Sequence, residues 1–120
     1  MSTKKAPFSD KTIVGLEESI IIRQNGDSEE VTARIDSGAT KSSIDINLSS
    51  KLKLGPVVAS KMVKSANGAR LRPMVEVTIR IGDKELTENF TLADRSHMKY
   101  KVLIGQNILR RGFLIDPDKA

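Results

Sequence analysis

The sequence predicts an all-β domain with one short helix near its C-terminus. After residue 11, most segments alternate β-branched or apolar residues with polar ones, which is the period of half-buried strands. Strong turn signals separate these segments, at Asn25-Gly26, Asn67-Gly68 and Gly82-Asp83. Only residues 106–111 (QNILRR) have helical character, and Gly112 is placed to end that helix.

The first strands are expected to form a hairpin. Residues 12–22 (TIVGLEESIII) are rich in β-branched and apolar residues, and the Asn25-Gly26 turn links them to a second arm at 30–35. Apolar and polar residues alternate in that arm, so one of its faces should be buried. The arm runs directly into Asp36, which therefore follows a rigid strand.

The later elements complete one domain. In chain order they are a strand at 43–46, a helical turn or irregular link at 47–54, hairpin arms at 61–65 and 70–81 around a tip at 66–69, a strand at 84–92, a loop at 93–99, an apolar run at 102–105, the helix, and a last short strand from Phe113. With 120 residues, we expect a flexible polar arm at 1–11 and one domain at 12–120. With three Phe, one Tyr and no Trp, its core must consist mostly of Ile, Leu and Val.

The composition excludes several kinds of chemistry. The chain has no cysteine, so it forms no disulfide and has no thiolate nucleophile or ligand. Its single histidine, His97, cannot build the usual zinc sites of several His or Cys ligands, and we expect no metal and no cofactor. No apolar run approaches the roughly 20 residues of a membrane span, and the start lacks a secretory signal. We therefore expect a cytoplasmic protein that does not contact membranes.

The net charge of +5 is unevenly distributed. The segment from residue 51 to residue 80 contains several Lys and Arg residues but only one acidic residue, Glu76, so it should attract anions. A merely solvated basic face explains the same charges equally well. A basic β-barrel that binds nucleic acid is a further alternative, although the scarcity of aromatic residues argues against stacking on bases.

Two motifs could carry chemistry. Asp36-Ser37-Gly38-Ala39 places a carboxylate at the end of an apolar strand, beside a hydroxyl and a glycine that permits a tight turn. Alone, such a sequence is most often an ordinary surface turn. The second motif is the apolar run at 102–105, which ends in Gly105 and enters the predicted helix with Asn107.

Together these motifs resemble the retropepsin family of aspartic peptidases. In that family the Asp turn and the later apolar-apolar-Gly segment, with its short helix, pack together in each protomer, which gives Gly105 and Asn107 a structural role. The chain is also similar to a bacterial and archaeal group named ATP-dependent zinc proteases. That group includes a retropepsin-like protease associated with the ribosomal-protein glutamate ligase, which trims glutamate tails. The similarity covers roughly residues 12–118 and is carried by residues 13–16, 33–39, 77–82, 102–105 and 111–117.

The chain departs from that group beside the turn. Thr40-Lys41-Ser42 stands where Arg-Thr-Ser is usual, and Asp45 stands where a histidine is expected. Ser37 replaces a threonine but keeps the hydroxyl that, in retropepsins, braces the two turns of a dimer. These departures leave open a catalytically inactive peptide-binding module of the same fold. The zinc in the group's name finds no support in these residues.

The resemblance implies an acid-protease barrel and a homodimeric aspartic endopeptidase. Two carboxylates about 3 Å apart share one proton, so that one acts as base toward water and the other as acid. Only Asp36 has the required sequence context, and the other aspartates, apart from Asp45, look like solvated or capping carboxylates. A two-fold homodimer would supply the second carboxylate from the copy of Asp36.

The same resemblance predicts the roles of individual residues. The catalytic set would be Asp36, Ser37 and Gly38. A flap tipped by Asn67 and Gly68 would close over an extended peptide or protein substrate, which the basic segment suggests is acidic or glutamate-rich. The candidate substrate-binding residues are Ala39, Lys41, Lys64, Asn67, Gly68, Arg70 and Arg72.

Overall fold

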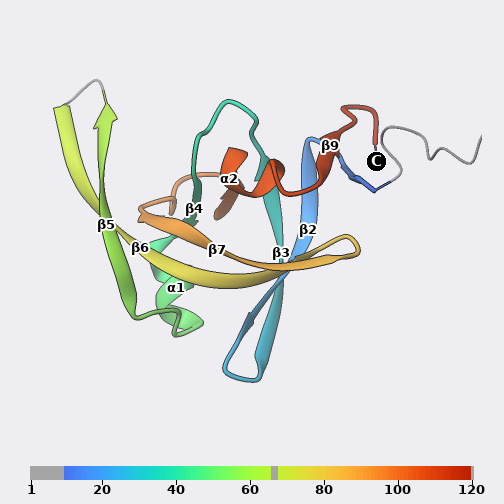
Figure 1. The fold of residues 1–120 in the computed structure, drawn as a ribbon. Coiled ribbons are helices and arrows are strands. Elements are labelled where there is room, and N and C mark those ends of the chain that lie inside the picture. The colour runs from blue at the N-terminus through green and yellow to red at the C-terminus, as the bar shows by residue number, and fades with distance from the viewer. Residues whose placement is uncertain (1–9, 66–67, 120) are drawn as a thin grey trace, which may run out of the picture.

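A computed structural model describes residues 10–65 and 68–119, which form a closed β-barrel with a projecting hairpin and two short helices (Figure 1). The strands are β1 (Thr12–Val14), β2 (Glu17–Gln24), β3 (Asp27–Ile35), β4 (Ser42–Asp45), β5 (Val57–Ser65), β6 (Gly68–Ile81), β7 (Lys84–Ala93), β8 (Val102–Ile104) and β9 (Phe113–Ile115). The helices are α1 (Ile46–Lys51) and α2 (Gln106–Leu109).

Six strands close the barrel in the order β2, β3, β8, β4, β7 and β6, because β2 pairs with both β3 and β6. In the β2–β6 register, Ile20 lies opposite Ile81 and Ile22 lies opposite Ile79. All four side chains are buried. The predicted all-β barrel is therefore confirmed.

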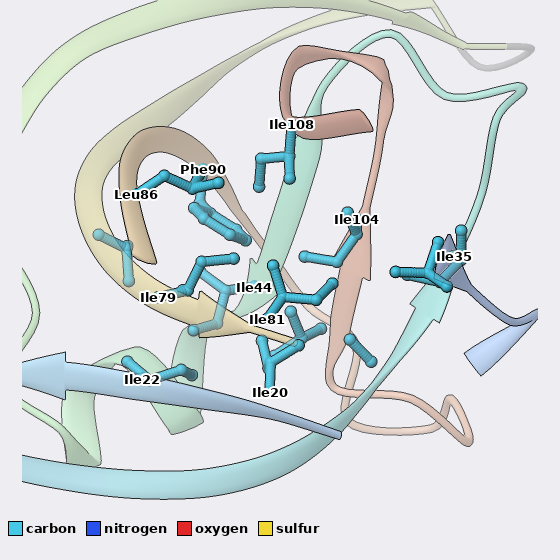
Figure 2. Packing of buried hydrophobic residues seen from close by; sticks show 14 of the residues in the cluster. Ile20, Ile22, Ile35, Ile44, Ile79, Ile81, Leu86, Phe90, Ile104 and Ile108 are labelled. Carbon is cyan, nitrogen blue, oxygen red and sulfur yellow. The ribbon is translucent and has the colours of Figure 1, made fainter. Parts of the chain in front are cut away.

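The core consists almost entirely of branched aliphatic side chains, with Phe90 and Phe113 as its aromatic members (Figure 2). Branched side chains fit the pleated, half-buried surface of a strand, and burying one fully stabilises a fold by about 1.5–3 kcal/mol. Ile35 and Ile104 belong to this core and lie at the ends of β3 and β8. The segment that follows each of them is therefore anchored to packed strands.

The first hairpin matches its prediction at the turn but not at its start. Asn25 and Gly26 have φ values of 50° and 86°, the left-handed pair that a two-residue hairpin turn requires. Residues 12–22, however, do not form one strand. They divide into β1 and β2, and β1 pairs in parallel with β9 at the other end of the chain. The backbone N–H of Gly15 donates to Glu18 Oε1 at 2.8 Å between the two strands.

The second hairpin is longer than predicted. β5 begins at Val57 rather than at residue 61, and it pairs antiparallel with β6 as far as the Ser65–Gly68 pair. The part of this hairpin nearest its tip projects away from the barrel, whereas the later part of β6 lies in the barrel wall (Figure 1). Ala66 and Asn67 lie outside the described residues.

The helices differ from prediction in number and length. The segment at 47–54, left open between a helical turn and an irregular link, overlaps α1, which begins one residue earlier, at Ile46. Asp45 caps α1 by accepting a hydrogen bond from Leu48 N at 3.3 Å. The predicted helix at 106–111 ends at Leu109, because Arg110 is its C-cap. Arg111 donates instead to Thr87 O at 2.9 Å, on β7. Arg111 therefore lies beyond the end of α2.

Candidate active site

Asp36 extends the ladder between β3 and β8 by one residue. Its backbone N–H donates to Ile104 O at 2.9 Å, immediately after the Ile35–Ile104 pair. Ile35 and Ile104 are buried, and the Asp36 side chain is half-buried at the point where the strand leaves the core. The local sequence, apolar strand followed by Asp-Ser-Gly, thus holds a carboxylate on a rigid base.

The turn itself is fixed by short-range hydrogen bonds. Gly38 N donates to Asp36 Oδ1 at 3.0 Å, and Ala39 N donates to Asp36 O at 3.2 Å. Gly38 does not have a left-handed φ, so the turn uses glycine at this position for its small size and not for its backbone conformation. A Cβ on Gly38 would lie 3.3 Å from Asp36 Oδ1. Ser37 and Gly38 are exposed, so the outer side of the turn faces solvent in the single chain.

Gly105 and α2 hold the Asp turn in place by hydrogen bonds and close backbone packing. Gln106 N donates to Ala39 O at 2.8 Å, and Asn107 N donates to Thr40 O at 3.2 Å. A Cβ on Gly105 would lie 2.3 Å from Lys41 O and 2.8 Å from Ala39 O, so the backbones meet too closely for any side chain. The expected packing of the Asp turn against the apolar-Gly segment is present.

Ser42 is a member of this assembly that the sequence did not single out. Its side chain is buried, its Oγ donates to Asn107 Oδ1 at 2.8 Å, and it accepts from Gly105 N at 2.9 Å. Asn107 Nδ2 then donates to Asn89 O at 3.0 Å, which ties α2 to β7. No local pattern indicates this role, because the partners of Ser42 lie 63 and 65 residues further along the chain.

Asp45, the other carboxylate that deserved attention in the sequence, has a structural role. It is 3% exposed, its Oδ2 caps α1, and its Oδ1 accepts from Arg95 N at 2.8 Å. Both oxygens are therefore engaged. Arg95 is itself buried: its Nε donates to Tyr100 O at 2.9 Å, and burial lowers the pKa of Arg95. The negative charges of Asp45 and Asp36 oppose this lowering of the pKa, whereas the positive charge of Arg34 adds to it.

The predicted substrate-binding cations are spread over two places. Lys41 follows the turn and is half-buried, and its carbonyl lies against Gly105. Arg72 lies on β6 opposite Lys61 and is half-buried. It alternates with Leu71 and Pro73, so it lies on the opposite face of β6 from the buried Val75 and Val77.

The other predicted flap residues are only partly described. Gly68 begins β6 with a φ of 108°, a conformation that suits glycine. Lys64 and Arg70 have strand positions on β5 and β6, but their side chains are outside the described part of the structure. Asn67 lies outside the described residues. Roles for these residues, and for Lys41 and Arg72, stay predictions.

The described residues lack two features that define other classes of protein. Within residues 10–65 and 68–119, no group of three or more His, Cys, Asp and Glu side chains could hold a metal ion. None of the helices in this part of the chain is both long and apolar enough to cross a membrane. The cytoplasmic location stays a prediction.

The barrel and the turn define a retropepsin-like acid-protease domain, and solved structures share this fold. The EIAV protease in complex with the inhibitor HBY-793 matches with a TM-score of 0.62 and 16% identity, over 90% of this chain and 93% of that chain. The protease of Simian Foamy Virus (mac) matches with a TM-score of 0.59 and 14% identity, over 78% of this chain and 91% of that chain. The protein Lpg0085 of Legionella pneumophila, of unknown function (DUF785), matches with a TM-score of 0.65 and 21% identity, over 90% of this chain and 95% of that chain.

Comparison with sequence profiles assigns the chain to one family within this class of protein. The profile of the RimB-like family, described as "Retropepsin-like aspartic endopeptidase RimB", matches residues 47–120, and the chain belongs to this family. The matched residues include Gly105 and α2 but begin after Asp36. No curated protein matches the chain.

Proposed function

We propose that this chain is an active aspartic endopeptidase whose site forms in a homodimer from Asp36 and its copy. The observation that carries the proposal is the rigid placement of one half-exposed carboxylate, held by Gly38 N and anchored through its own N–H to Ile104. Membership of a family of retropepsin-like aspartic endopeptidases supports it. Asp45 cannot easily replace the second carboxylate, because both its oxygens accept hydrogen bonds within the chain.

The chemistry follows from bringing the two Asp36 carboxylates together on a two-fold axis. At about 3 Å they cannot both be ionised, so they share one proton. The ionised group takes a proton from a water held between them, and that water attacks the carbonyl carbon of the peptide bond. The protonated group donates its proton to the carbonyl oxygen, which gives a tetrahedral intermediate with two hydroxyl groups. As the C–N bond breaks, the proton taken from water passes to the leaving amine and a hydroxyl proton of the intermediate returns to the other Asp36, so the pair again holds one proton. The exposed Ser37 hydroxyl is available to brace the turn of the partner chain.

The substrate is proposed to be an extended peptide held beneath the β5–β6 hairpin, whose projecting strands can close over it. An acidic or glutamate-rich peptide is favoured by the net charge of +5 and by the basic residues of this hairpin. Lys41, Lys64, Arg70 and Arg72 are the proposed contacts for its carboxylates, and Ala39, Asn67 and Gly68 for its backbone.

The dyad is tested with Asp36→Asn, with Asp118→Asn as control because Asp118 is an exposed carboxylate in a turn near the C-terminus. Peptide turnover should disappear in D36N and persist in D118N. In subunit-exchanging mixtures of wild-type and D36N chains, turnover should fall as the square of the wild-type fraction, because a mixed dimer carries only one ionisable Asp36. A linear fall would contradict the dimer. Peptide binding without turnover by the wild-type protein would favour the inactive peptide-binding module.

A further inference from the structure

Arg34 shares the face of β3 on which the candidate catalytic carboxylate lies. Ala33 and Ile35 are 0% and 6% exposed and point into the core. Side chains alternate along a strand, so Arg34 and Asp36 both point away from the core, with their Cα atoms about 6.6 Å apart at 3.3 Å per residue. The ladder bond from Asp36 N to Ile104 O keeps this extended geometry up to Asp36.

The acidic residue opposite Arg34 makes no ion pair with it in the described part of the chain. Glu17 lies directly opposite Arg34 in the β2–β3 register, the position of an attractive cross-strand pair. Its Oε2, however, accepts a hydrogen bond from the Tyr100 hydroxyl. Arg34 is exposed, and within the described residues its guanidinium makes neither a hydrogen bond nor an ion pair. A cation next to the candidate catalytic site is thus left for an external anion.

A second guanidinium lies within electrostatic reach of the same place. Arg95 is 9% exposed, and among the described residues its side chain donates only through Nε, to Tyr100 O. The charges that act on it include those of Arg34 and Asp36, so the two guanidinium groups and the carboxylate share one local field. Arg95 therefore adds positive charge to the field at this place, and such a field favours an anion there.

We propose that Arg34, supported by Arg95, is a specificity-determining residue of the Asp36 site and binds the carboxylate of an acidic side chain next to the bond that is cut. This inference rests on the proposed function. A peptide whose scissile bond lies over Asp36 advances about 3.3 Å per residue, so a neighbouring side chain comes within reach of Arg34. Arginine presents a planar fork that binds a carboxylate through two parallel hydrogen bonds.

The dimer would extend this preference to both sides of the bond. A two-fold axis through the paired Asp36 residues places one Arg34 on each side of the scissile position. Arg34 would therefore select the two residues that flank the cut. Lys64, Arg70 and Arg72 on the β5–β6 hairpin would act on the peptide further from the bond, in a role that the Arg34 subsite does not require.

The experiment uses one peptide sequence with Glu, Gln or Lys at the two positions that flank the cut. The wild-type protein should prefer Glu to Gln in kcat/KM. In Arg34→Gln that preference should fall at least tenfold, whereas Arg80→Gln, a change at an exposed arginine on β6, should keep it. In Arg34→Glu, turnover of the Lys peptide should rise above that of the wild-type protein, a gain that misfolding cannot produce.

The outcomes separate this inference from the proposed function. Turnover by the wild-type protein with an unchanged Glu-to-Gln ratio in the Arg34 variants would overturn the role of Arg34 and leave the dyad standing. No turnover of any peptide would overturn the proposed activity instead. In that case calorimetric binding of the same Glu and Gln peptides tests Arg34 directly, and equal affinities for wild type and Arg34→Gln would refute it.

Discussion

Gly105→Ala is expected to destabilise the protein by about 3 kcal/mol or more, at the upper end of the cost of overpacking. The new Cβ would lie 2.3 Å from Lys41 O, 2.7 Å from Lys41 C and 2.8 Å from Ala39 O. All three are backbone atoms of the segment that leaves the Asp turn, so no side-chain rotation can relieve the clash. Moving the segment away would also break the 2.8 Å hydrogen bond from Gln106 N to Ala39 O, which adds about 1 kcal/mol.

The measurement is urea and thermal unfolding at one fixed protein concentration, because dimerisation would otherwise shift the midpoint. A loss of about 3 kcal/mol corresponds to a fall in Tm of roughly 12 °C or more for a domain of this size. Gly38→Ala is the matched control. It lies in the same turn, but its Cβ would approach only the Asp36 carboxylate, at 3.3 Å. We expect it to cost less than about 1 kcal/mol.

A Gly105→Ala variant within about 1 kcal/mol of the wild-type protein would refute the reasoning. That result would mean that the turn and α2 can separate without loss, so that the backbone packing does not hold Asp36 in place. A variant that is destabilised yet keeps full turnover at low temperature would instead separate stability from the geometry of the site.

Two further predictions concern buried and exposed serines. Ser42→Ala should cost about 2 kcal/mol in urea unfolding, because it leaves the buried Gly105 N–H without its acceptor, whereas Ser43→Ala should change stability by less than about 0.5 kcal/mol. The Ser96 hydroxyl and then its backbone N–H donate to Asp94 and hold the pKa of Asp94 below its ordinary value. The stability from this contact is therefore present above the ordinary pKa and is lost as pH falls through the folded pKa. NMR titration should show the pKa of Asp94 rising in Ser96→Ala, and an unchanged midpoint would contradict that cause.

The elements that the sequence predicted well are those whose signal is local. The alternation in β3 identified its buried face, and the Asn25-Gly26 pair identified a turn that needs two left-handed residues. The packing of the turn that begins at Asp36 against Gly105 was also predicted, although from the resemblance to a family rather than from spacing. Both residues follow apolar strands that belong to one core.

The features that the sequence could not provide depend on partners far along the chain. β1 separates from β2 because it pairs with β9, and no pattern within residues 12–22 indicates that pairing. Ser42 looks like an ordinary strand-edge polar residue until the fold brings Gly105 to it, and the structural role of Asp45 depends on Arg95, 50 residues further along the chain. Arg34 was missed for a related reason. Its proposed role depends on the contact between Tyr100 and Glu17, which lie 83 residues apart in the sequence.

The turn divides its polar groups between two directions, and this division assigns their roles. The carbonyls of Ser37, Ala39 and Thr40 point inward and accept hydrogen bonds from α2. The Asp36 carboxylate, the Ser37 hydroxyl and Arg34 lie on the outer side, where the described residues give Arg34 and that hydroxyl no hydrogen-bond partner. Inward groups are satisfied within one chain, so their loss must appear in the free energy of unfolding. The Ser37 hydroxyl and Arg34 have no such partner among the described residues, so under the proposed function their loss should change association and turnover while the isolated fold keeps its stability.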